Sequence, residues 1–257
     1  MASVIRRAIE TVSTSRADDL AFHALADVSG ILGQVEDARI VGGQMVALLL
    51  EAFPSEGVVP RRTADADAAV STVVAGSGIL HQELTAAGYE ATAGNNYRRS
   101  GRSIDVLIPA PAGHFTQEEH GGRAFDAAPG IRLALAAEPI IVDANVTMLD
   151  GSLLSFTARV PSPEVAVILK AYAIQGRFAA KDAVDLHNLL TIVDSWPVAE
   201  IGGWRLDRAS LNGSRSDAAH ILHRFAETAQ ANPALRAAEI RGPRLVALIR
   251  KHVARVG

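Results

Sequence analysis

The sequence contains no cysteine and only three lysines, and both shortages restrict its chemistry. Without cysteine, disulfides, thiolate metal sites and cysteine nucleophiles are excluded. The lack of disulfides fits a reducing compartment, and we expect a cytoplasmic protein. Lys170, Lys181 and Lys251 are the only lysines among 25 basic residues, and the first two lie in one short stretch.

Long hydrophobic runs and an excess of positive charge are missing too. The longest apolar runs, Val46 to Leu50 and Ile104 to Pro109, are far shorter than the roughly 20 residues that a membrane span needs. The N-terminal segment lacks the continuous apolar stretch of a signal peptide. With 25 basic and 28 acidic residues, the net charge is −3. We therefore expect no membrane contact, and nucleic acid could bind only at a local basic patch.

The 257 residues are 49% hydrophobic, which is enough for one large domain or two small ones with a real core. Up to about residue 160, strand and helix patterns alternate. After Pro161-Ser162-Pro163, only helical periodicity is found. We therefore predict an α+β class: an α/β domain over 1–160 with a mixed sheet flanked by helices and with N-terminal helices, followed by a helical domain over 161–257.

Periodicity and turn residues predict the individual elements of the first part. Helices are expected at 16–36, 44–53 and 79–87. Strands are expected at 39–41, at 63–70, around residue 97, at 104–108, at 140–148 and at 153–160, the last two joined by a turn at Asp150-Gly151.

Three aspartates are the first candidates for chemistry. Asp65 and Asp67 lie two residues apart on a predicted strand, so both carboxylates point to the same face, where they could bind a hard cation. Asp105 lies within another apolar strand, where a charge is costly without a partner. Taken alone, the pair also fits a solvated strand face, and Asp105 also fits a strand edge that faces water.

A glycine pair precedes these aspartates. Gly42-Gly43 follows a predicted strand and comes directly before a predicted helix. Backbone N–H groups at a helix N-terminus can approach phosphate oxygens closely when no side chain intervenes. Glycine pairs are common in turns, so the order of features is the specific part: strand, Gly-Gly, helix, Asp-x-Asp, then a single aspartate on a later strand.

This order resembles the nucleotidyltransferases of the DNA polymerase β superfamily. A second motif narrows the resemblance: Lys170 follows an apolar helical run, Arg177 comes about two turns later, and Lys181-Asp182-x-x-Asp185-Leu186 follows. Together with Arg61-x-Thr63-x-Asp65-x-Asp67, this is similar to the AbiEii-type toxins of toxin–antitoxin systems. The alternative for the second motif is a solvated helix with an ordinary Lys181–Asp185 ion pair.

The resemblance implies a nucleotidyltransferase that uses two Mg²⁺ ions and an NTP, with transfer of NMP to an acceptor hydroxyl. The implied metal ligands are Asp65, Asp67 and Asp105, which are also catalytic together with Lys170 and Asp182. The implied nucleotide-binding residues are Gly42, Gly43, Arg61, Thr63, Lys170 and Lys181.

The acceptor implied by the resemblance is RNA, tRNA in the first place, and a cognate antitoxin is an implied partner. Arg98, Arg99 and Arg102, and a basic helix from Arg236 to Arg255, are candidate RNA-binding patches. One alternative is a small-molecule acceptor such as an aminoglycoside, which an acidic acceptor side would favour. Another is a catalytically silent nucleotide- or protein-binding module of the same fold.

Overall fold

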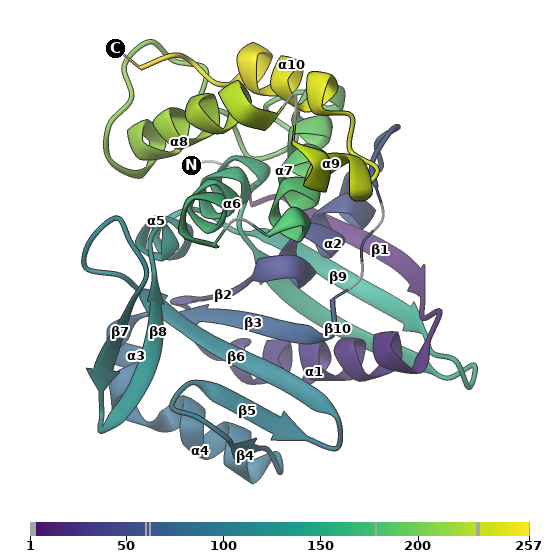
Figure 1. Cartoon of the computed structure of the whole chain (residues 1–257). Coiled ribbons are helices and arrows are strands. Elements are labelled where there is room, and N and C mark those ends of the chain that lie inside the picture. The colour runs from purple at the N-terminus through teal and green to yellow at the C-terminus, as the bar shows by residue number, and fades with distance from the viewer. Residues whose placement is uncertain (1–3, 60, 62, 178, 230–231, 257) are drawn as a thin grey trace.

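Figure 1 shows a computed structural model of the chain, which describes residues 4–59, 61, 63–177, 179–229 and 232–256. Two β-sheets occupy the lower part of the view, and the helices that follow residue 160 lie above them. The predicted α+β class is confirmed: a mixed sheet flanked by helices precedes a helical segment.

The larger sheet is built on β2 (Ala38–Val41), β3 (Asp65–Val70) and β6 (Arg102–Pro109). β3 runs antiparallel to β2 and parallel to β6, so the sheet is mixed. Beyond β6 the sheet divides into two branches. One branch holds β5 (Asn96–Arg99) and β4 (Glu90–Ala91), and the other holds β8 (Arg123–Ala128) and β7 (Thr116–His120).

The smaller sheet has the order β1-β9-β10, with β1 (Arg6–Val12), β9 (Ile140–Thr147) and β10 (Leu153–Val160). Helix α1 (Arg16–Leu32) contacts β10, β6 and β3, and therefore joins the two sheets. It begins where the Ser15 side chain accepts a hydrogen bond from the Asp18 backbone N–H, as expected for an N-cap serine.

The remaining helices before residue 160 connect strands. They are α2 (Gly42–Ala52), α3 (Thr72–Ser77), α4 (Ile79–Ala86) and α5 (Ile131–Ala136). After residue 160 come α6 (Pro163–Arg177), α7 (Ala180–Ser195), α8 (Gly213–Ala229), α9 (Pro233–Ala237) and α10 (Gly242–His252).

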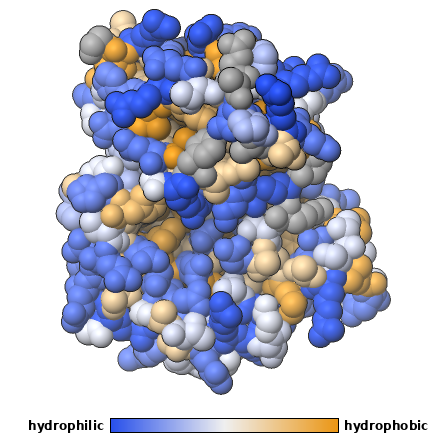
Figure 2. All heavy atoms as spheres, in the orientation of Figure 1, coloured by the Kyte–Doolittle hydropathy of each residue, from blue (hydrophilic) through white to orange (hydrophobic). Residues whose placement is uncertain are grey.

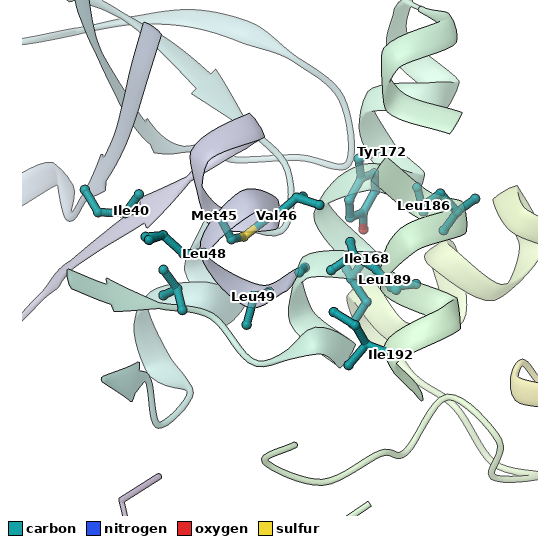
Figure 3. Packing of buried hydrophobic residues seen from close by; sticks show 14 of the residues in the cluster. Ile40, Met45, Val46, Leu48, Leu49, Ile168, Tyr172, Leu186, Leu189 and Ile192 are labelled. Atoms are coloured by element: carbon teal, nitrogen blue, oxygen red, sulfur yellow. The ribbon is translucent and has the colours of Figure 1, made fainter. Parts of the chain in front are cut away.

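Helix α2 packs between the larger sheet and helices α6 and α7. Figure 3 shows Met45, Val46 and Leu49 of α2 close to Ile168 of α6 and Leu189 of α7. All five belong to one buried hydrophobic cluster that contains residues from both sides of residue 160. The division into two domains stays a prediction, but the largest core cluster continues across the predicted boundary.

The predicted elements are confirmed with shifts of a few residues. Helix α1 ends at Leu32, four residues before its predicted end, and α2 begins at Gly42 itself. The strands around 39–41, 63–70, 97, 104–108, 140–148 and 153–160 are all present. After residue 160, the described residues contain helices and no strand, as predicted.

Strands β1, β4, β7 and β8 and the short helices α3 and α5 were missed, and one predicted helix was wrong. The β1 segment, RRAIETV, is rich in charge because it lies at a sheet edge. The β7–β8 hairpin was missed because TQEEH carries no apolar alternation. The predicted helix from Arg236 to Arg255 is two helices, α9 and α10. Glu239 has a φ of 60° between them, and Gly242-Pro243 begins the second.

The surface of the protein is mainly hydrophilic on the face shown in Figure 2, as expected for a sequence without long apolar runs. The hydrophobic residues on this face form smaller patches. None of the helices in the described part of the chain is long and apolar enough to cross a membrane.

Candidate active site

A cleft of about 420 Å³ lies between the larger sheet and helices α6 and α7. Its floor includes the end of β2, the start of α2, and residues of β3, β6 and β8, and its roof includes residues of α6 and Lys181 of α7. Of the ten residues predicted for the site, nine line this cleft: Gly42, Gly43, Arg61, Thr63, Asp65, Asp67, Asp105, Lys170 and Lys181. The exception is Asp182, which is fully buried beside it.

Strand pairing brings the three predicted metal-binding carboxylates together. Asp67 pairs with Asp105 in the parallel β3–β6 ladder, so the two side chains stand side by side on one face of the sheet. Asp65 lies two residues before Asp67 and therefore points to the same face. One carboxylate oxygen from each of the three residues lies within 4.8 Å of the other two. Oxygen ligands at this spacing suit a hard cation such as Mg²⁺.

The electrostatics of the triad favour a cation. Burial is the main cause that raises the pKa of Asp67 to about 7; the charges of Asp65 and Asp105 contribute to this rise, while Lys170 and Arg177 oppose it. Burial also raises the pKa of Asp105, against the hydrogen bond that it accepts from Asn96. Like charges held this close repel one another. A divalent cation would remove that cost, so the residues present fit a metal ion.

Gly42 makes room for Asp67. A Cβ atom at Gly42 would lie 1.7 Å from Oδ2 of Asp67 and 2.8 Å from its Cβ, and Gly42 also has a φ of +66°. Only glycine adopts this conformation at no steric cost. The first glycine of the predicted motif is therefore required by the aspartate opposite it, whether or not a phosphate is bound.

Gly43 has a similar relation to the segment before β3. A Cβ at Gly43 would lie 2.7 Å from Nη2 of Arg61 and 2.9 Å from Cγ2 of Thr63. The Thr63 hydroxyl donates a hydrogen bond to Oδ1 of Asp65 at 2.5 Å, which orients that carboxylate. Arg62, which stands between Arg61 and Thr63 in the sequence, lies outside the described residues.

The roof of the cleft is a network of paired charges. Nζ of Lys170 lies 2.7 Å from Oδ2 of Asp185 and 3.3 Å from Oδ1 of Asp182. Arg61 donates to both oxygens of Asp185, at 2.9 and 2.8 Å. Arg177 donates to both oxygens of Asp182, at 3.0 and 3.2 Å. The network thus joins α6, α7 and the segment before β3.

These contacts determine how the roof residues are placed. Burial raises the pKa of Asp182, but Arg177 and Lys170 outweigh it and the pKa lies below its usual range. Asp182 therefore stays ionised and holds two cations over the cleft. The simple Lys181–Asp185 surface pair is wrong: Asp185 is buried and pairs with Arg61 and Lys170, while Lys181 is exposed at the cleft.

Sequence reasoning missed two residues of the cleft, Asp126 and Phe115, because they belong to the unrecognised β7–β8 region. Asp126 lines the cleft, accepts a hydrogen bond from Asn95 at 3.2 Å and adds to the negative field at Asp105. Phe115 lies just before β7 at the cleft wall. The sequence signal that could have found them is the turn at Gly121-Gly122 between two short polar segments.

Part of each predicted basic patch is engaged in ion pairs. Arg102 and Arg99 both pair with Asp27 of α1, at 2.6 and 4.0 Å. Lys251 pairs with Asp194 of α7. These contacts reduce the positive charge available for phosphates at either patch.

Comparison with known proteins adds little. No protein-family model matches the chain, and no curated protein matches it. Among solved structures, the chain is similar to a solution structure of the antibiotic-resistance factor ANT(2'')-Ia, at 15% identity over 90% of this chain and 95% of that chain, with a TM-score of 0.35. A likeness this low carries no argument about function, and the resemblance to AbiEii-type toxins has no support from a family match.

Proposed function

We propose that this protein is a metal-dependent nucleotidyltransferase that moves NMP from an NTP to an acceptor hydroxyl. The observation that carries the proposal is the convergence of Asp65, Asp67 and Asp105 at a cleft that begins at Gly42-Gly43 and has lysine and arginine side chains in its roof. Paired carboxylates that face a cationic wall suit a divalent cation and a polyphosphate together.

In this proposal, Asp65, Asp67 and Asp105 would hold Mg²⁺, which when bound supplies neutralising charge to the triphosphate. The acceptor oxygen attacks the α-phosphorus, the bond from the α-phosphorus to the bridging oxygen breaks, and pyrophosphate leaves. Asp105 lies on the side of the triad away from Gly42, so it is placed to take part in removing the acceptor proton. Its raised pKa is consistent with a group that accepts a proton.

The roof would bind the triphosphate. Lys170, Arg177 and Lys181 line the cleft opposite the acidic floor, and a lysine can meet phosphate oxygens as a compact point charge. Asp182 and Asp185 lie behind Lys170, so we assign them to positioning. A phosphate that enters the cleft would meet cations already held in place.

One feature of the cleft favours a small basic molecule over RNA as the acceptor of the NMP group. Asp126 stands beside Asp105 and makes the acceptor side acidic, which suits an amine and disfavours a nucleic-acid backbone. An RNA acceptor, tRNA included, and an antitoxin partner rest on the resemblance to AbiEii-type toxins alone.

The test of the transfer reaction is turnover. We expect the purified protein to release pyrophosphate from an α-labelled NTP when Mg²⁺ and an acceptor are present, and we expect Asp67→Ala to abolish release. Circular dichroism and a melting curve of the variant check that it folds. A binding-only module would bind NTP without release, and that outcome would refute the proposal.

The acceptor is identified by where the label goes. Incubation with α-labelled NTP, Mg²⁺ and either total RNA or a set of aminoglycosides separates the two classes. Label on an aminoglycoside that is reduced by Asp126→Asn supports the acidic acceptor side. Label in a tRNA-sized band that is unaffected by Asp126→Asn would instead support the RNA acceptor.

A further inference from the structure

The cleft has two chemically different halves. Gly42, Arg61 and the acidic triad line one half together with the roof cations. The other half is mostly apolar, with Leu107, Phe115, Ala128, Pro129, Leu169 and Ala173, and it also holds the polar side chains of Thr116, Gln117 and Asp126. The proposed function uses the charged residues, Asp126 included, and leaves the apolar residues unexplained.

Phe115 is unusual among the aromatic residues. Its side chain is 47% exposed, and within the described part of the chain it is the one aromatic residue in the exposed class. It also belongs to none of the hydrophobic clusters found there. An exposed aromatic ring at a cleft wall is not explained by core packing, whereas it suits contact with a planar ligand.

The helix opposite is shaped to accept this ring. Gly176 lies near the end of α6, and a Cβ there would be 2.8 Å from Cδ2 and 2.9 Å from Cε2 of Phe115. The glycine therefore permits one edge of the ring to rest on α6 at the cleft roof.

We infer that the apolar half is the nucleobase subsite and that Phe115 is the stacking platform for the base. This inference rests on the proposed function. An NTP has a polyanionic half and an aromatic half, and this one cleft is lined both by cations and by apolar residues that include an aromatic ring. Stacking on a ring is tolerant of base identity, so Phe115 would add affinity for every NTP.

The experiment measures the contribution of the base to affinity separately from that of the phosphates. The full chain is titrated with Mg²⁺ and each of two probes, ATP and inorganic tripolyphosphate, in a calorimeter. We expect ATP to bind more tightly than tripolyphosphate. In Phe115→Ala this advantage should fall by about tenfold to a hundredfold, while tripolyphosphate binding stays unchanged.

Three further variants and one control make the test specific. Phe115→Trp keeps a ring and should retain the advantage, whereas Phe115→Leu keeps an apolar side chain without a ring and should lose it. Gly176→Ala should also reduce the advantage, because the added Cβ displaces the ring, even though alanine favours the helix. Leu153→Ala removes an exposed side chain of the smaller sheet (67% exposed) and should change nothing.

The outcomes distinguish the two ideas. If Phe115→Ala keeps the full ATP advantage, or if the wild type binds ATP and tripolyphosphate equally, the nucleobase subsite is refuted while phosphate binding survives. If the wild type binds neither probe, the proposed function fails and the subsite with it.

Discussion

The floor and the roof of the cleft carry charge in opposite ways. The floor brings Asp65, Asp67 and Asp105 within reach of one another, and burial together with these like charges raises the pKa of Asp67 to about 7. In the roof, Asp182 and Asp185 each accept from two cationic side chains.

This difference indicates that the floor is a ligand-binding surface and that the roof is a structural support. A group of like charges is destabilising until a ligand of opposite charge arrives, so the floor is the part of the protein that requires a ligand. Buried charges that are fully paired cost much more to disturb than to keep. The roof is therefore built before any ligand binds.

The largest effect is expected from the roof. Asp185→Asn leaves Lys170 and Arg61 without their shared carboxylate, and we expect the free energy of unfolding to fall by about 3–5 kcal/mol. Asp194→Asn is the control, because it removes a partly exposed pair with Lys251 and should cost less than about 1 kcal/mol. Urea titrations of the three proteins measure both values. Equal losses would mean that the roof is not preorganised.

A smaller loss of stability is expected from a substitution at Gly42, which lies against Asp67 in the floor of the cleft. Gly42→Ala places a Cβ against the Asp67 carboxylate and keeps a positive φ. We expect a loss of about 2–3 kcal/mol in stability and loss of Mg²⁺ binding. Gly78 has a φ of +74° with nothing within 4 Å of its added Cβ. Gly78→Ala therefore reports backbone strain alone, about 1 kcal/mol, and should bind Mg²⁺ normally in calorimetry.

The smallest effect has the opposite sign and depends on pH. The pKa of Asp67 is raised from 3.8 to about 7 on folding. Its contribution to stability is therefore complete below about pH 4 and is lost as the pH rises through about 7. Asp67→Asn removes the charge, so it should stabilise the metal-free protein by on the order of 2 kcal/mol at pH 8 and by nothing at pH 4.

Magnesium should reverse the stability advantage of Asp67→Asn over the wild type at pH 8. Mg²⁺ binds the ionised carboxylates, so it should raise the melting temperature of the wild type at pH 8 and leave that of Asp67→Asn nearly unchanged. Melting curves at both pH values, with Mg²⁺ and with a chelator, measure the effect. A variant that is less stable than the wild type at pH 8 without metal would show that Asp67 is structural.

Local patterns were enough to predict most of the elements. The predicted helix 79–87 and the strands on either side of Asp150-Gly151 depend on neighbours in the sequence, and the structure has them. The β7–β8 hairpin was not predictable in this way, because β7 has no apolar face of its own and is held by pairing with β8, which in turn pairs with β6. The missed residues Asp126 and Phe115 follow from that single failure.

The candidate site was predictable as a set of residues but not as an arrangement. The Asp65-x-Asp67 spacing places two carboxylates on one face of a strand, because side chains alternate along it. Nothing in the spacing says that Asp105 pairs with Asp67, since that contact depends on which strands lie side by side.

By itself, the sequence determined the α+β class, the local elements and the short-range motifs, because these depend on periodicity and on residues a few positions apart. Only the tertiary structure decided that Gly42 clears space for Asp67, that Asp185 holds Lys170 and Arg61, and that Phe115 rests on Gly176. Each of these is a contact between residues far apart in the chain, and the cost of closing such loops is met only when the whole core packs.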